Sequence, residues 1–186
     1  MHPELQALLA AADAAEADAL SLVQGLSNAQ GNWQPTGGAS WSVAQCLDHL
    51  AKINQIYVGH FLPVVERAVA EGRGPFVGIR PTGFGRKFVQ SLEPPPRQKT
   101  KTFARVVPGA TIDVADALAA YVASHEPYRR MVQAANGVDV NRVGAQNPFI
   151  TALRIRAETA LLVPPAHDRR HLWQARQVLR APGFPR

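Results

Sequence analysis

Cysteine is almost absent from the sequence, since Cys46 is the only one among 186 residues. A single thiol cannot form a disulfide within the chain, which excludes the small disulfide-stapled domains typical of secreted proteins. The first residues include acidic side chains where a secretory signal has basic ones, and no unbroken apolar segment follows them. We therefore expect a protein of a reducing compartment, the cytoplasm.

Long apolar runs are also missing. A helix that crosses a bilayer needs roughly 20 mostly apolar residues, and the longest candidates here are interrupted by Pro63 or by Pro164 and Pro165. This excludes a transmembrane protein, and we expect no membrane partner. The length suits one domain whose core needs no disulfides. We expect a single domain over residues 1–186, with a long basic connection rich in Gly and Pro at about 73–111.

Acidic residues are scarce in that connection. The formal net charge of the chain is +6, and between Arg73 and Arg105 eight basic residues accompany a single acidic one, Glu93. Gly, Pro and the lack of sustained periodicity indicate a surface loop, with a short helix at 84–92 as the exception. No nucleic-acid recognition motif or aromatic stacking platform accompanies the charge, so we expect no specific nucleic-acid partner.

Four amphipathic helices are predicted from the spacing of apolar residues. The first covers about residues 3–26 and ends before a cluster of glycines and a proline. The third begins after Ile112 with Asp113 as its N-cap and stops near Gly137, with a kink expected at Pro127.

The second helix has the clearest start. Ser42 is followed three positions later by Gln45, which is the pattern of a capping box. Trp41, just before the cap, is placed to pack on Cys46. The apolar arc of this helix continues to about Ala70.

The last helix ends near Leu179, but its start is open between two positions. It begins either near Arg156 or at Pro164 and Pro165, which suit a first turn. No strand pattern survives, because Pro and Gly interrupt the short runs of β-branched residues. We therefore predict an all-α fold, a four-helix bundle with a long irregular connection between the second and third helices.

His167 and His171 lie four positions apart on the last helix. Side chains at this spacing share one helix face, so both imidazoles reach a single point, as a bidentate metal site requires. Gln174 continues the same stripe, which predicts that the face points inward, where imidazoles without partners are costly. The pair lacks the glutamate of the H-E-x-x-H motif, so a hydrogen-bonded pair of core histidines remains an alternative.

His49 is the natural third ligand. It lies within or at the edge of the apolar arc of the second helix, beside Leu50. One histidine facing an HxxxH pair brings three neutral nitrogens together from two helices, with the far side of the metal left open.

The segments 41–50 (WSVAQCLDHL) and 167–175 (HDRRHLWQA) resemble the DinB superfamily. The resemblance covers about residues 5–179 in layout, although only these two segments carry specific motifs. It implies a four-helix bundle, commonly dimeric, that holds one divalent metal ion on three histidines. It further implies a thiol transferase or isomerase that uses a low-molecular-weight thiol. The matching positions imply three metal ligands: His49, His167 and His171.

Other polar residues near the motifs have more ordinary interpretations. We expect Cys46 to pack in the core rather than to act as a soft ligand or redox group. His60 lies too far along its helix to share the ion. His125 falls on an apolar stripe, so a satisfied core histidine is favoured over a contact to the site or substrate. Asp48 and Asp168 adjoin the ligands in sequence but point elsewhere on their helices, and neither is assigned as a base.

The chemistry of such a site follows from its charge. Three neutral imidazoles leave the charge of a divalent ion uncompensated, so a bound water or thiol becomes acidic. Hydrolysis usually needs a positioned carboxylate, which the spacing does not supply, so we favour a metal-dependent thiol S-transferase acting on a small-molecule electrophile. The alternatives are a metal-dependent hydrolase and a non-catalytic metal-binding or stress-response protein. Imidazole ligands suit zinc, nickel and iron alike.

The expected partners are a small-molecule substrate and a second copy of the chain. Arg86 and Lys87 on the short helix would bring positive charge to the entrance of the metal pocket and favour anionic ligands. Apolar contact near Trp33 and Trp173 would support a homodimer.

Overall fold

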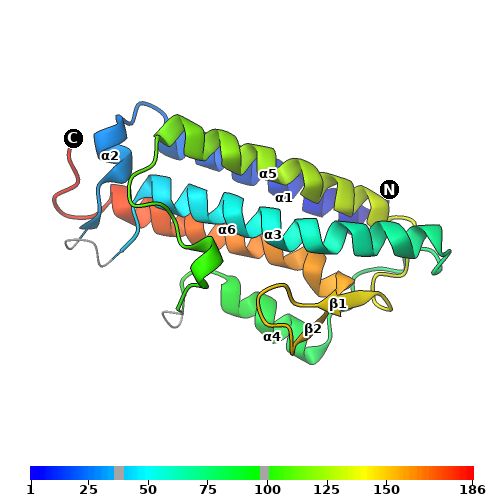
Figure 1. Ribbon diagram of the computed structural model, residues 1–186. Helices are drawn as coiled ribbons and strands as arrows, with labels where there is room; N and C mark the ends of the chain where they lie inside the picture. Colours follow the sequence, from blue (N-terminus) through cyan, green and yellow to red (C-terminus); the bar gives the residue numbers. More distant parts are fainter. Residues whose placement is uncertain (36–39, 97–100) are drawn as a thin grey trace.

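Four long helices lie alongside one another and form the body of the molecule (Figure 1). The computed structural model describes residues 1–35, 40–96 and 101–186. The long helices are α1 (Pro3–Val23), α3 (Val43–Ala70), α5 (Val114–Ala135) and α6 (Ala157–Leu179). Helix α5 packs against α3 and α1, and α6 packs against the same two helices. The predicted all-α class is confirmed.

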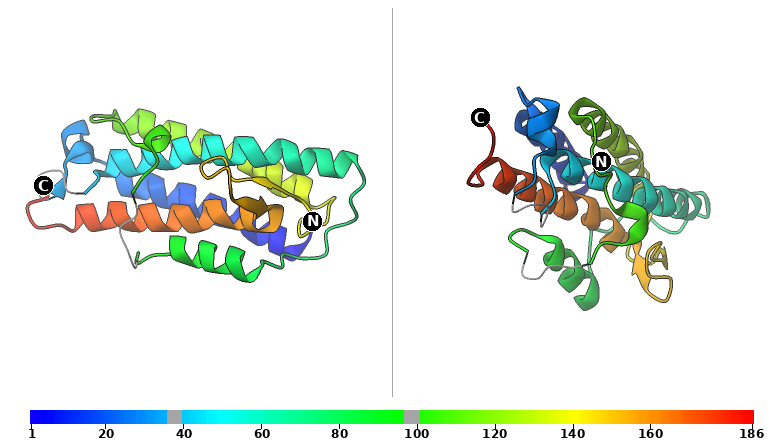
Figure 2. Two further views of the ribbon diagram at one scale, coloured as in Figure 1. Left: turned by 60° about the horizontal axis from the view of Figure 1, so that its bottom comes forward. Right: turned by 60° about the vertical axis from the view of Figure 1, so that its left-hand side comes forward.

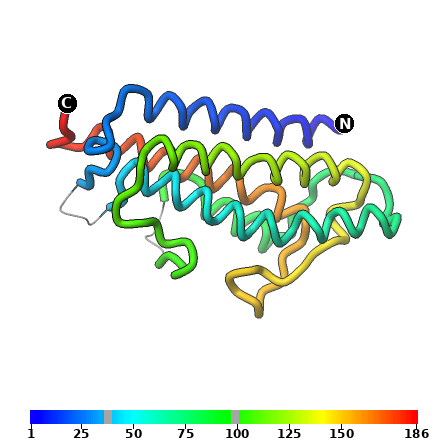
Figure 3. Tube along the Cα trace, turned by 45° about the horizontal axis from the view of Figure 1, so that its top comes forward, coloured from blue at the N-terminus to red at the C-terminus, as the bar shows by residue number. Residues whose placement is uncertain are grey.

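Several short elements decorate this body. They are α2 (Asn28–Asn32), α4 (Gly83–Leu92), the 3-10 helix η2 (Ala104–Val106) and the strands β1 (Gly144–Gln146) and β2 (Arg154–Arg156). Helix α4 lies along the outside of α6 (Figure 2). The η2 segment and the loop between the strands lie on one side of the helices, and the two chain termini lie at opposite ends (Figure 3). Within the described ranges, no helix is both long and apolar enough to cross a membrane.

The strands correct the expectation that the chain has none. β1 and β2 pair in antiparallel fashion, with Ala145 opposite Ile155. Strands of three residues are too short to show the alternation by which a strand is read from sequence. Only Ile155 in the second strand is buried. The fold is thus helical with one small hairpin directly before α6.

The connection between α3 and α5 is also more ordered than the irregular segment that its composition predicts. Helix α4 corresponds to the short helix expected at 84–92. It approaches α6 closely at Gly85, where a Cβ atom would lie 2.1 Å from Thr159 Oγ1. Phe88 packs on the core, whereas Phe84 is exposed. A glycine at the contact therefore lets a segment rich in breakers dock as a helix.

Apolar side chains fill the space between the long helices in two clusters. One is built around Phe61, Met131 and Leu161, and the other around Leu47 and Tyr121. Each such side chain contributes about 1.5 to 3 kcal/mol when it is fully buried. The helices therefore associate through extensive apolar contact.

Helices α3 and α5 begin where the caps predict. The Ser42 hydroxyl accepts a hydrogen bond from Gln45 N at 3.2 Å, and Gln45 Oε1 accepts one from Ser42 N at 3.1 Å. The Asp113 carboxylate accepts from Asp116 N at 3.1 Å. Helix α1 stops at Val23, earlier than the apolar spacing indicates.

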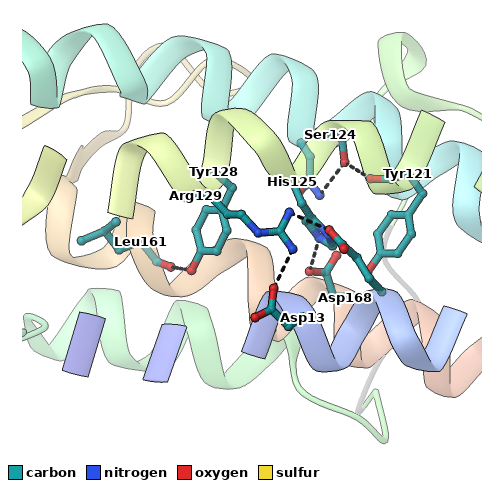
Figure 4. Close-up of polar contacts among 10 residues, drawn as sticks. Asp13, Tyr121, Ser124, His125, Tyr128, Arg129, Leu161 and Asp168 are labelled. Atoms are coloured by element: carbon teal, nitrogen blue, oxygen red, sulfur yellow. Dashed lines mark hydrogen bonds and ion pairs between the residues drawn. The ribbon is translucent and has the colours of Figure 1, made fainter. Parts of the chain in front are cut away.

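The start of α6 settles the alternative that the sequence leaves open. The helix begins at Ala157 and continues through Pro164 and Pro165. Proline has no backbone N–H, so Pro165 leaves the carbonyl of Leu161, four residues earlier, without its helical donor. The Tyr128 hydroxyl of α5 donates to that carbonyl at 2.8 Å (Figure 4). A neighbouring helix thus satisfies the group that the proline frees.

Candidate metal centre

Three histidine side chains meet between α3 and α6. His49 comes from α3, and His167 and His171 come from successive turns of α6. Each offers a ligand atom, and these atoms all lie within 4.8 Å of one another. All three side chains are buried. The structure brings together the three residues that the sequence motifs single out, in an arrangement that suits a metal ion.

Two of these imidazoles are oriented by hydrogen bonds on their outer nitrogens. His49 Nδ1 lies 2.7 Å from the carbonyl oxygen of Val106. A carbonyl can only accept, so Nδ1 carries the proton and Nε2 keeps its lone pair. His171 Nδ1 lies 3.1 Å from Gln174 Oε1, which fixes the same tautomer. Both lone pairs are thereby left for a metal.

Burial keeps the cluster neutral. Removal from water is the main cause that lowers the pKa of His49 and lowers the pKa values of His167 and His171 well below the ordinary range. The neighbouring imidazoles and the positive charge of Arg170 lower the pKa values of His167 and His171 further. Neutral imidazole is the form that binds a metal.

The contact between His167 and His171 fits a cation. Their Nε2 atoms lie 3.1 Å apart, and the His171 Nε2 atom holds a lone pair. If His167 carries its proton on Nε2, its buried Nδ1 atom lacks a donor among the described residues; if the proton is on Nδ1, two lone pairs face each other. The described protein groups leave His167 Nδ1 unsatisfied in either tautomer, which is costly for a buried polar atom. In the second arrangement, a divalent ion would bind the two facing Nε2 lone pairs and remove their repulsion.

Trp41 covers the cluster from the start of α3. Its ring centroid lies 4.7 Å from that of His49 and 5.5 Å from that of His171, with which it is stacked. The sequence predicts that Trp41, just before the N-cap, packs on Cys46. The indole does pack on the apolar cluster that includes Cys46. Its position over the imidazoles is additional, and no spacing in the sequence indicates it.

A backbone segment holds His49 in place from the other side. Residues 106–110, here called the strap, lie alongside α3. Polar side chains on successive turns of α3 contact this segment. Gln45 Nε2 donates to the Gly109 carbonyl at 2.9 Å, and Asp48 accepts from Gly109 N at 3.0 Å. Lys52 donates to the strap at 3.2 Å. The strap therefore presents the Val106 carbonyl to His49 at a fixed position.

Asp168 turns away from the cluster and belongs to a different buried network. His125 has no exposed surface, and its Nε2 lies 3.1 Å from Asp168 Oδ2 (Figure 4). Its Nδ1 lies 2.8 Å from Glu16 Oε1, and Arg129 pairs with Glu16 at 2.8 Å. The prediction of a satisfied core histidine is confirmed. Neither Asp168 nor His125 lies in the metal cluster.

The remaining candidates are also placed outside the cluster. Cys46 is fully buried, and burial raises the pKa of its thiol far above the range in which a thiolate forms. Asp48 is engaged by Lys52 at 2.7 Å and by the strap. His60 is not part of the cluster. Sequence reasoning therefore finds the three histidines but misses Val106, which approaches from a distant connection that has no pattern of its own.

Comparison with known proteins identifies one family. A model of the DinB superfamily matches residues 11–175, most of the chain. No curated protein and no solved structure matches it.

Proposed function

The chain belongs to the DinB superfamily, and from this premise we propose that it is a metal-dependent thiol S-transferase of the cytoplasm that acts on a small-molecule electrophile. His49, His167 and His171 hold one divalent ion, and the four long helices correspond to a four-helix bundle. The observation that carries the proposal is the meeting of three buried, neutral imidazoles within 4.8 Å.

An open coordination sphere supports a reactive site. Within the described ranges, no fourth His, Cys, Asp or Glu joins the cluster. The stretches 36–39 and 97–100 contain none of these residue types either. A divalent ion with three protein ligands keeps positions for other groups and lowers the pKa of a thiol or water that binds there.

The residues around the cluster favour thiol transfer over hydrolysis. Val106 and Gln174 orient two of the imidazoles, and the Trp41 ring packs on His49 and His171 as an apolar neighbour. Both carboxylates next to the ligands in sequence are occupied elsewhere, Asp48 by Lys52 and the strap and Asp168 by His125. A hydrolase usually has such a group to position and deprotonate water. A thiol needs less help, because its proton leaves readily beside a dication.

Two alternatives are kept as outcomes of experiment. In a metal-dependent hydrolase, the ion would activate water without a protein base. In a non-catalytic metal-binding or stress-response protein, the ion would be needed for folding or sensing. The donor set suits zinc, nickel or iron. Elemental analysis of protein purified without an affinity tag identifies the metal, and a screen of low-molecular-weight thiols with electrophiles then tests transfer.

Replacement of a ligand tests the centre itself. We expect His171→Ala to weaken metal binding roughly a hundred-fold or more, because one of three donors is lost. The far-ultraviolet circular dichroism should change little, since the core is apolar. Chelator competition measures the affinity. His60→Ala, a histidine of α3 outside the cluster, is the control and should bind metal as the native chain does.

Each result has a clear consequence. Full metal occupancy in His171→Ala would remove this residue from the ligand set. If the metal-free native protein proves unfolded, the site is structural, and the non-catalytic alternative replaces the transferase.

A further inference from the structure

Four polar side chains of α3 form one stripe that faces the strap. Their positions follow the spacing i, i+3, i+4 and i+7 of a single helix face: Gln45, Asp48, His49 and Lys52. Each side chain forms a hydrogen bond with the backbone of the strap. One of the four, His49, belongs to the metal cluster. The other three therefore bind the same short segment that orients a metal ligand.

The strap has little regular structure of its own. Its first residues, Val106 and Val107, donate backbone hydrogen bonds backward to the start of η2. Further along, the Gly109 N–H donates to Asp48 Oδ2 at 3.0 Å, and the Gly109 carbonyl accepts from Gln45 at 2.9 Å. Side chains of α3 thus bind both polar backbone groups of Gly109.

Asp48 contacts the strap both directly and through Lys52. Its Oδ2 atom accepts from Gly109 N and also from Lys52 Nζ, which lies at 2.7 Å. Lys52 in turn donates to the Val107 carbonyl at 3.2 Å. Hydrogen bonds with an ionised partner are about twice as strong as neutral ones. A single carboxylate oxygen therefore stabilises the strap at residue 109 and, through Lys52, at residue 107.

The orientation of His49 depends on this segment. The Val106 carbonyl, next to the residues that Asp48 and Lys52 bind, accepts from His49 Nδ1 at 2.7 Å, which leaves the Nε2 lone pair for a metal. His171 differs, because its Nδ1 partner lies three residues away on its own helix, α6. The groups that position the strap therefore also set the orientation of His49.

We propose that Asp48 is a positioning residue of the metal centre. Through the Gly109 N–H it keeps the strap against α3, and the Val106 carbonyl then fixes His49 with Nε2 available to the ion. Asp48 is not a member of the histidine cluster, so it acts through the strap. Groups that orient a metal-ligating histidine contribute about ten-fold to a hundred-fold to metal affinity. The inference rests on the proposed metal centre, and it adds a residue outside the ligand set.

Two substitutions separate the hydrogen bond of Asp48 from its charge. Asp48→Ala removes both, whereas Asp48→Asn is neutral but keeps an oxygen that can accept from Gly109 N. Chelator competition with Zn²⁺ measures the metal affinity of the full chain. We expect Asp48→Ala to weaken binding roughly ten-fold, because the Val106 carbonyl loses its fixed position. Asp48→Asn should recover most of the affinity.

The tautomer of His49 in the metal-free protein gives a second readout, which does not depend on metal binding. Nitrogen-15 NMR of the imidazoles distinguishes a proton on Nδ1 from one on Nε2. We expect His49 to carry its proton on Nδ1 in the native chain and in Asp48→Asn, and to exchange between both tautomers in Asp48→Ala. His171 should keep its Nδ1 proton in all three proteins, because Gln174 lies on the same helix.

Glu66→Ala is the matched control. It removes another acidic side chain of α3, one that pairs with Arg130, and it should bind Zn²⁺ as the native chain does. Native zinc affinity in Asp48→Ala, or a His49 tautomer unchanged from the native chain, would overturn the inference and leave the metal centre intact. Equal losses of affinity in Asp48→Ala and Asp48→Asn would assign the effect to charge alone and also overturn it. If the native chain binds no Zn²⁺, the proposed zinc centre fails, and this inference fails with it.

Discussion

At the scale of single residues, His125 is the most deeply buried of the described histidines. It belongs to α5 and has carboxylates on both sides, Glu16 from α1 and Asp168 from α6. Tyr121 and Arg129 are the titratable neighbours on its own helix. Burial alone would lower the pKa of His125, but hydrogen bonds to Asp168 and Glu16 and their negative charges outweigh burial and raise it. The folded protein therefore binds this proton more tightly than the unfolded chain.

The raised pKa of His125 predicts how stability depends on pH. Its contribution is fully present below the unfolded pKa, about 6.5. It is lost as pH rises through the higher folded pKa, because Asp168 then becomes a buried carboxylate without a cationic partner. We expect the free energy of unfolding to fall with rising pH above about 6.5. Urea unfolding of metal-free protein across that range measures it.

Substitution of His125 supplies the control for this pH dependence. In His125→Gln the side chain can donate to one carboxylate but has no charge, and we expect a loss on the order of 3 kcal/mol. The decline of stability above pH 6.5 should become shallower. A slope identical to that of the native chain would show that another group is responsible.

The sequence indicates some residues of the site and not others, for a physical reason. His167 and His171 are predicted because helical spacing fixes which side chains share a face, and His49 because it lies at the edge of an apolar arc. Val106 acts through its backbone carbonyl, which any residue type provides. Trp41 lies over the imidazoles because of how the helices pack against each other. The periodicity of a single segment does not indicate which residues of another helix it will contact.

At the scale of elements, α6 continues through two prolines because α5 compensates for a missing donor. The Tyr128 hydroxyl, on a side chain 1% exposed, donates to the Leu161 carbonyl at 2.8 Å. Tyr128→Phe would leave that buried carbonyl without a donor. We expect a loss of about 1 to 3 kcal/mol in the free energy of unfolding, measured by urea denaturation.

Another buried tyrosine gives a matched control. Tyr57 is 3% exposed, but its hydroxyl has no hydrogen-bond partner in the described part of the chain. Tyr57→Phe removes a buried polar group that gains nothing, so we expect no loss of stability or a small gain. Equal losses in the two variants would contradict the compensation of the proline by Tyr128.

Element boundaries follow the sequence where a local signal marks them. The caps at Ser42 and Asp113 set the starts of α3 and α5, because side-chain oxygens satisfy N–H groups that a helix start leaves unpaired. The start of α6 stays open in the sequence, since its continuation through Pro165 depends on a hydroxyl from another helix. The hairpin is missed because its strands are stabilised by pairing with each other. Three residues are too few to show the alternation of apolar and polar side chains that identifies a strand.

At the scale of the whole molecule, we predict a homodimer. The tryptophans that suggest it are not freely exposed, since Trp33 and Trp173 are half-buried and Trp33 packs against Phe184 at 5.5 Å between ring centroids. Exposed apolar side chains occur elsewhere, for example Leu20 and Ile150. Sedimentation velocity at micromolar concentration should show a dimer. A single monomeric species there would refute this prediction.

The positive charge of the segment from Arg73 to Arg105 predicts a weak, salt-sensitive attraction to nucleic acid. Attraction through released counterions falls steeply as salt rises and depends little on sequence. Two of these cations have partners within the protein: Arg73 pairs with Glu71, and Arg105 lies over Phe149. Helix α4, the one helix of eight or more residues described within this segment, buries one side against α6 and cannot fill a groove. Fluorescence anisotropy with an arbitrary duplex should show binding at low salt that disappears near 0.15 M, roughly the physiological ionic strength. Sequence-selective binding that persists there would replace small-molecule chemistry as the leading hypothesis.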